Sequence, residues 1–208
     1  MIKYNIEQCS EAWFNIRLGR VTGTSFKDLM AKKETAAYRN LIADIAAEKI
    51  TGLSEDADNY ESEWMTRGKE LEPIAANYYS ELFDIELEQT GFVTFETDNK
   101  YFNWCGVSPD RLIKNTGILE IKCPKRSTHW YYLQSEKLPS EYYWQVMGQL
   151  FVTGADYCDF MSFYPDLKPF IIQVLPDKKA FEQIEKELDI LIEKVNLQIS
   201  NYNQIELL

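Results

Sequence analysis

The stretch from Val107 to Pro124, VSPDRLIKNTGILEIKCP, predicts a two-stranded β-hairpin that carries acidic side chains. A first β-type run ends at Ile113, and a second run, from Ile118 to Lys122, alternates strictly between apolar and charged residues. Between the two runs stand three residues with turn chemistry, Asn115, Thr116 and Gly117.

Strand alternation places Glu120 and Lys122 on one face of the second strand, about 6 to 7 Å apart. Leu119 and Ile121 then face the other side, and the hairpin returns Asp110 toward the same end. Two carboxylates and one ammonium form a poor core, but such oxygen ligands suit magnesium or manganese. Any half-exposed strand can alternate Glu and Lys, so the E-x-K triplet alone carries little weight.

The pair Pro109-Asp110, followed by Glu120-Ile121-Lys122, resembles the PD-(D/E)xK nuclease signature. More specifically, SPDRL with LEIKCP is similar to the phage lambda exonuclease family of viral alkaline exonucleases. The resemblance implies an α/β restriction-endonuclease-like fold, a mixed central β-sheet flanked by helices. It also implies a magnesium-dependent, processive 5′ to 3′ exonuclease that hydrolyses linear double-stranded DNA in phage-type recombination.

The same resemblance implies roles for individual residues. Asp110 and Glu120 would bind Mg²⁺, with Mn²⁺ as a substitute, and the backbone carbonyl of Ile121 would add a ligand. Lys122 would position or deprotonate the attacking water. The pattern G-K-x-x-E that ends at Glu72 resembles the family's acidic helix residue, which would help to bind a second metal; taken alone, a helical Glu is usually solvated.

The segment AWFNIRLGRVTGTSF, residues 12–26, places hydroxyl groups before a helix, where backbone N–H groups readily bind phosphate. Thr and Ser also cap helices without any such role. The segment is similar to the part of the lambda exonuclease family that binds the terminal 5′ phosphate. Carried over, the binding residues would be Arg17 and Thr24, with Ser108 nearby.

Gln145 matches a glutamine that the family places beside its active site. The sequence departs from the family at Met147, where relatives often carry a second Gln, and at Arg111, where the lambda enzyme has a small residue. The single histidine, His129, cannot support a His-metal nuclease, and a surface or packing role is the better interpretation.

The chain has 208 residues, 45% of them hydrophobic, which suffices for one sizeable core and predicts a single domain over residues 1–208. It has no run of about 18 apolar residues and no secretory leader, so we expect no membrane span and a location in the cytoplasm of a bacterial or phage-infected cell. The cysteines form no C-x-x-C pair, which favours buried reduced thiols over zinc or an iron–sulfur cluster. They are Cys9, Cys105, Cys123 and Cys158.

The net charge of −11 is unusual for a protein that should bind DNA. Basic residues gather in segments 17–39 and 121–137, whereas acidic residues crowd the stretch that begins at Glu55. We expect a bipolar surface that is basic inside a groove and acidic outside, although a merely solvated acidic face is the plainer alternative. Relatives form a trimeric ring around DNA, which implies a homotrimer, and the family implies a single-strand annealing partner.

Periodicity and cap residues predict the remaining elements. Helices are expected from Ser10 to Gly19, over 35–51, from about Glu61 to Phe83 with a kink or new first turn at Pro73, after a cap at Ser127 or Thr128, from Ser140 to Thr153, and after Asp177. Strands are expected over 85–96, 101–107, 158–164 and 170–175. An endonuclease of the same superfamily and a catalytically silent DNA-binding module remain as alternatives.

Overall fold

In the computed structural model, residues 1–54, 63–114 and 116–205 are described, and their main sheet has five strands in the order β2-β4-β5-β6-β7. These strands are β2 (Leu87–Glu88), β4 (Arg111–Ile113), β5 (Gly117–Lys122), β6 (Tyr157–Ser162) and β7 (Phe170–Val174). Only β5 and β6 pair in parallel, so the sheet is mixed. β1 (Ile2–Tyr4) and β3 (Phe92–Thr94) form a separate two-stranded sheet.

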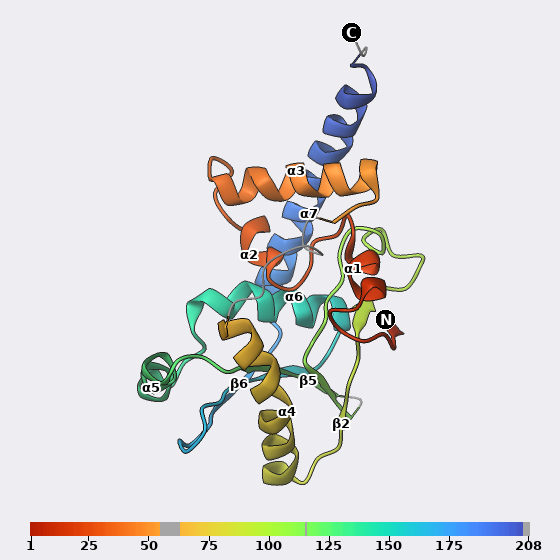
Figure 1. Ribbon diagram of the computed structural model, residues 1–208. Coiled ribbons are helices and arrows are strands. Elements are labelled where there is room, and N and C mark those ends of the chain that lie inside the picture. The colour runs from red at the N-terminus through yellow and green to blue at the C-terminus, as the bar shows by residue number, and fades with distance from the viewer. Residues whose placement is uncertain (55–62, 115, 206–208) are drawn as a thin grey trace.

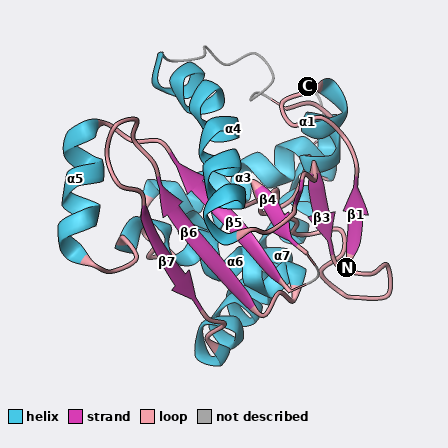
Figure 2. Cartoon of the chain, turned by 90° about the horizontal axis from the view of Figure 1, so that it is seen from below, coloured by secondary structure: helices cyan, strands magenta, loops and turns pink. Residues whose placement is uncertain are grey.

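Helices cover both faces of the main sheet (Figure 1). α4 (Glu63–Phe83) packs on one face through a cluster that includes Tyr79, Leu119 and Ile121. α6 (Tyr143–Thr153) packs on the other face, with α3 (Ala36–Thr51) and α7 (Lys178–Asn203) beyond it. The shorter helices are α1 (Glu11–Arg17), α2 (Ser25–Leu29) and α5 (Arg126–Ser135). Figure 2 shows α5 beside the β6 and β7 edge and α1 near the opposite edge.

The predicted hairpin is present. β4 and β5 pair antiparallel, with Arg111 opposite Leu119. The alternation of β5 is also confirmed, because Leu119 and Ile121 belong to the cluster under α4 while Ile118 belongs to the cluster under α6. Gly117 starts the strand rather than completing the turn, and Asn115 lies outside the described residues.

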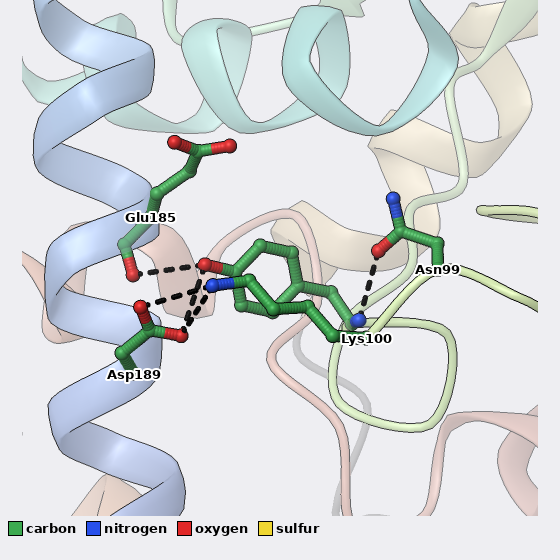
Figure 3. Close-up of polar contacts among 5 residues, drawn as sticks. Asn99, Lys100, Glu185 and Asp189 are labelled. Atoms are coloured by element: carbon green, nitrogen blue, oxygen red, sulfur yellow. Dashed lines mark hydrogen bonds and ion pairs between the residues drawn. The ribbon is translucent and has the colours of Figure 1, made fainter.

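The strand predicted over 85–96 is broken into β2 and β3, which belong to different sheets. The strand predicted over 101–107 is wrong over 101–104, which form a turn, and is reduced to isolated β-bridges at Cys105 and Val107. Asn99 Oδ1 accepts the N–H of Tyr101, and the Tyr101 carbonyl accepts the N–H groups of Trp104 and Cys105, so this backbone turns. Side-chain hydrogen bonds to Glu185 and Asp189 hold the turn against α7 (Figure 3).

The caps expected at Ser10 and Asp177 are confirmed. The helix expected over 35–51 is present as α3, and Thr35 caps it. The caps expected at Ser127 or Thr128 and at Ser140 are wrong. The Lys125 carbonyl already accepts the N–H of His129, so α5 starts earlier, at Arg126. The Pro139 carbonyl accepts the N–H of Tyr142, which makes a 3₁₀ turn of Ser140–Tyr142 and delays α6 to Tyr143.

α4 runs through Pro73 without restarting. Its expected start at Glu61 lies outside the described residues. The acidic run that begins at Glu55 also lies outside them, apart from the backbone of Glu63. The apolar stripe of α7 is core within the chain, since Ile184 and Leu188 are fully buried. Cys9 is exposed, contrary to the expectation of buried thiols. No helix in the described ranges is long and apolar enough to cross a membrane.

Gly148 allows α2 and α6 to approach closely, because a Cβ atom there would lie 2.3 Å from the buried ring of Phe26. We expect Gly148→Ala to lower the free energy of unfolding by about 1 to 3 kcal/mol, measured by urea denaturation. The control is Gly68→Ala in α4, where a Cβ would meet nothing within 4 Å, and which should raise stability by about 0.5 to 1 kcal/mol. Equal effects at the two positions would contradict this packing.

Candidate active site

Glu120 is a buried carboxylate in the middle of the sheet, only 1% exposed. Its Oε1 accepts hydrogen bonds from Gln145 Nε2, at 2.5 Å, and from Lys122 Nζ. Its Oε2 accepts a hydrogen bond from Gln149 Nε2 at 2.6 Å. A buried charge is tolerated only when it is paired and hydrogen-bonded, and here three donors meet both oxygens. β5 and α6 together therefore fix the position of this carboxylate.

Asp110 lies immediately before β4, and a backbone N–H group of β5 binds its side chain. Its Oδ2 accepts the N–H of Ile121 at 2.5 Å. Burial and the neighbouring carboxylate of Glu120 raise the pKa of Asp110 well above its usual value, although Lys122 acts in the opposite direction. The two carboxyl groups that the hairpin was predicted to bring together are therefore close enough to repel each other.

Lys122 completes this group from the same face of β5 as Glu120. Burial acts to lower the pKa of its ammonium, but the carboxylates of Glu120 and Asp110 outweigh burial and raise the pKa above the usual lysine value. Lys122 is therefore held in its charged form, with its Nζ 5.2 Å from the centre of the Tyr142 ring.

The three residues adjoin an open hollow of about 710 Å³, which we call the central hollow. Asp110 and Lys122 line it, Glu72 faces it from α4, and Lys125 and Thr128 line it from the side of α5. Glu120 is buried and does not line the central hollow itself, but its strand neighbours Ile121 and Lys122 do.

Glu72 forms an ion pair with Arg111 of β4. Arg111 Nη1 donates to Glu72 Oε1 at 2.8 Å and also to the backbone carbonyl of Asp110. The Arg111 side chain is 12% exposed, so this ion pair is largely shielded from solvent. Glu72 thus lies on the wall opposite β5, and Arg111 offsets its charge. Glu72 nevertheless contributes to the raised pKa of Asp110.

The residues expected to bind a 5′ phosphate are only partly brought together. The guanidinium of Arg17 lies 3.9 Å from the centre of the Trp13 ring and donates to Thr22 Oγ1 at 3.0 Å. Trp13 Nε1 in turn donates to Ser108 Oγ at 2.9 Å. Arg17 and Thr22 line a hollow of about 280 Å³, whereas Thr24 is exposed and does not line it.

Gln149 is the site residue that we did not predict from the sequence. It lies four residues after Gln145 on α6, so both amides face the same side of the helix and each reaches one oxygen of Glu120. The signal was the Q-x-x-x-Q spacing. Met147, where relatives often carry a second glutamine, is 1% exposed and packs in the core.

The donor set around Asp110 suits a hard divalent cation. Two carboxylates crowd together, Lys122 offsets part of their charge, and a cation would relieve the remaining repulsion. Among the described residues, no three His, Cys, Asp or Glu side chains are grouped to hold a metal ion by themselves. Magnesium is commonly bound by one or two carboxylates while it keeps several waters, so the set fits magnesium better than a metal that needs a full protein cage.

Comparisons with known proteins identify the relatives of this chain. Residues 12–156 match the model of a YqaJ-like viral recombinase domain. The chain is similar to the crystal structure of LHK-Exo, an alkaline exonuclease from Laribacter hongkongensis, with a TM-score of 0.83, 30% identity, and coverage of 94% of this chain and 97% of that one. The complex of LHK-Exo with dAMP gives the same TM-score and coverage at 29% identity. No curated protein sequence gives a significant match.

A phage-related exonuclease from Haemophilus somnus shares the fold, with a TM-score of 0.67, 14% identity, and coverage of 88% of this chain and 96% of that one. The predicted α/β restriction-endonuclease-like fold, with a mixed central sheet flanked by helices, is thereby confirmed, as is the resemblance to the lambda exonuclease family.

We expect Asp110→Asn to stabilise the fold at neutral pH, because the asparagine keeps an acceptor for the Ile121 N–H and removes a repelling charge. The raised pKa favours the protonated carboxyl in the folded state. Ionisation of Asp110 therefore begins to destabilise the fold at about pH 4, the ordinary pKa of an aspartate. The destabilisation grows until the pH passes the raised pKa of Asp110, and above that pH it is complete.

The gain in melting temperature of Asp110→Asn over wild type should consequently grow with pH across that window, measured by thermal unfolding in metal-free buffer. The same substitution at exposed Asp98 is the control and should change stability by less than about 0.5 kcal/mol. A gain that is largest at acid pH would mean that the repulsion has been misassigned.

Proposed function

The chain belongs to the family of YqaJ-like viral recombinase domains, and on that premise we propose that it is a metal-dependent deoxyribonuclease that degrades linear double-stranded DNA from its 5′ ends. Its relatives of known structure include the alkaline exonuclease LHK-Exo. The observation that carries the proposal is the group formed by Asp110, Glu120 and Lys122 beside the central hollow, with both oxygens of Glu120 fixed by Gln145 and Gln149.

Asp110, Glu120 and the Ile121 carbonyl would hold Mg²⁺ or Mn²⁺, which supplies positive charge to a phosphate and activates water when it is bound. The protein's own contribution is placement. Gln145 and Gln149 prevent the Glu120 carboxylate from rotating, and the Ile121 N–H does the same for Asp110. Fixed groups of this kind act on the developing charge without having to reorganise during the reaction.

Lys122 positions the attacking water and offsets negative charge at the phosphate. Its raised pKa favours this role over removal of a proton from the water, which would need a neutral amine. Glu72 would assist a second ion from the opposite wall, and its ion pair with Arg111 would regulate how much negative charge that wall presents.

We expect Asp110→Asn, Glu120→Gln and Lys122→Ala each to reduce DNA hydrolysis by at least about a hundredfold in saturating magnesium. The control is Lys114→Ala, at an exposed lysine on the same hairpin whose ammonium contacts Glu86. A near-wild-type rate for any of the three variants would remove that residue from the mechanism, and a loss in the control would point to a general effect on the hairpin.

The form of the DNA substrate, linear or circular, distinguishes exonuclease activity from endonuclease activity. We expect the wild-type protein to digest linear duplex with magnesium and to leave covalently closed circles intact, as followed by gel electrophoresis. Addition of EDTA should stop the reaction. Digestion of circles would assign the chain to the endonuclease alternative, and the absence of any hydrolysis would favour a silent DNA-binding module.

We infer that the Arg17 side chain, supported by Trp13, binds the terminal 5′ phosphate, with Ser108, Thr22 and Thr24 as further contacts. Arg17→Ala should then slow digestion of 5′-phosphorylated ends by roughly ten- to a hundredfold, since charge-assisted hydrogen bonds contribute about 1.5 to 3 kcal/mol. Dephosphorylated ends should be much less affected. Equal slowing of both substrates would mean that Arg17 only supports α1.

We also propose that residues 1–208 act as one nuclease domain in a homotrimer that encircles DNA in the cytoplasm and transfers its product to a single-strand annealing protein. A ring would compensate for the net charge of −11 by topological confinement. Light scattering should give a trimeric mass, and digestion should continue after competitor DNA is added. A monomeric mass together with immediate arrest would refute the ring and leave the active site unaffected.

A further inference from the structure

The α5 helix exposes two aromatic side chains to solvent. Trp130 is 53% exposed and Tyr131 is 71% exposed. They line an open hollow of about 630 Å³ together with Arg126 and with Leu167 from the loop between β6 and β7. Adjacent aromatic rings are costly to leave in water, and such rings on a protein surface commonly mark a binding site.

A buried contact holds α5 in place beneath these rings. His129 is fully buried, its Nδ1 lies 2.8 Å from Ser162 Oγ on β6, and its Nε2 lies 3.0 Å from the Lys168 carbonyl. The packing role expected for this histidine is therefore confirmed. Because the opposite side of the same helix is anchored to the sheet, Trp130 and Tyr131 sit on a rigid support.

Cationic side chains connect the two rings to the central hollow. A second hollow, of about 370 Å³, lies between them and is lined by Arg67, Lys125, Arg126 and Tyr164. Lys125 also lines the central hollow, and Arg126 also lines the hollow beside Trp130. The recessed surface is thus continuous from Asp110 to Tyr131.

The charge of this surface favours an anionic partner. Arg67 donates to the backbone carbonyls of Cys123 and Pro124, at 2.8 and 3.1 Å, and lies over the ring of Tyr164, so its guanidinium is fixed in place. There is no Asp or Glu among the described residues that line the hollow beside Trp130 or the hollow beside Arg67. In a chain with a net charge of −11, a surface with cations and no carboxylates favours an anionic partner. The exposed rings, on which bases can stack, favour nucleic acid among anionic partners.

We propose that the α5 surface, formed by Arg67, Lys125, Arg126, Trp130 and Tyr131, binds unpaired nucleotides of the cut strand on the 3′ side of the scissile phosphate. The inference rests on the proposed function. Bases of single-stranded DNA stack on exposed aromatic rings while cations contact the phosphates, whereas bases in a duplex are already stacked and paired.

The arrangement of the elements gives the polarity. α1, which carries Arg17, and α5 lie on opposite sides of β5 in both views (Figures 1 and 2). A strand whose 5′ phosphate lies at Arg17 and whose scissile phosphate lies at Asp110 would therefore continue toward α5. The α5 surface would hold the strand apart from its complement ahead of the cut.

The test is a binding measurement without metal, so that no hydrolysis occurs. The probe is a 5′-phosphorylated, 3′-fluorescein oligodeoxynucleotide, and anisotropy gives its Kd for the full-length protein. We expect the double variant Trp130→Ala, Tyr131→Ala to raise the Kd at least tenfold, the change that loss of one or two stacked bases produces. The double variant Trp130→Phe, Tyr131→Phe should restore most of the affinity, because it keeps both rings.

Tyr202→Ala is the matched control, since Tyr202 is 55% exposed on α7, far from this surface in the sequence, and it should leave the Kd unchanged. Arg126→Gln should weaken binding and reduce its dependence on salt. A 2-aminopurine base placed on the 3′ side of the scissile position should be quenched by wild type and by the Phe variant, and not by the Ala variant.

Several results would overturn the proposal. The first is an unchanged Kd in the double Ala variant, and the second is a loss of its duplex binding without a loss of single-strand binding. The third is a loss of subunit association of this variant in light scattering. The fourth is a loss of its binding to an annealing protein while its affinity for DNA stays intact. Failure of the proposed function is a separate result. A wild-type protein that binds the oligonucleotide through these rings but hydrolyses no DNA when magnesium is added would refute the nuclease assignment alone.

Discussion

The arrangement of the whole molecule depends on how one buried carboxylate, Glu120, is compensated. An ionised carboxylate inside a sheet is strongly destabilising unless donors surround it. Here the donors come from Gln145 and Gln149 on α6 and from Lys122 on the same strand. α6 must therefore lie across β5 in one register, and the close packing of Gly148 against Phe26 between the two glutamines holds it there. The layered packing of α6 on the sheet thus keeps the donors next to the Glu120 carboxylate.

Local patterns were sufficient to predict the part of the site that lies on the hairpin. Strict alternation from Ile118 to Lys122 determines which side chains share a face, and a short hairpin brings Asp110 back beside Glu120. The caps at Ser10 and Asp177 were predictable for the same reason, because a cap is decided within one turn of helix. The family resemblance rested on these same short segments and is confirmed by the comparisons.

Features set by contacts between distant segments could not be read from the sequence. Residues 101–107 have the composition of a strand, but Tyr101 is bound to Asp189 on α7, and the backbone turns instead. The ion pair of Arg111 with Glu72 joins residues on β4 and α4, and neither residue indicates the other. Gln149 carried a visible spacing signal, yet only the crossing of α6 over β5 gives that spacing a meaning.

The parallel pairing of β5 with β6 affects which part of the protein unfolds first. The strand with Glu120 and the helix with its glutamine donors belong to one crossover, and parallel neighbours can be joined only through such a connection. α1, in contrast, is tied to the rest of the chain through single contacts such as the Trp13 indole with the Gly91 carbonyl and Ser108. Proteins open locally where few contacts hold a segment. Partial opening should therefore release α1 first and leave the group of Asp110, Glu120 and Lys122 in place, so that the proposed hydrolytic centre would outlast the proposed contact with a chain terminus.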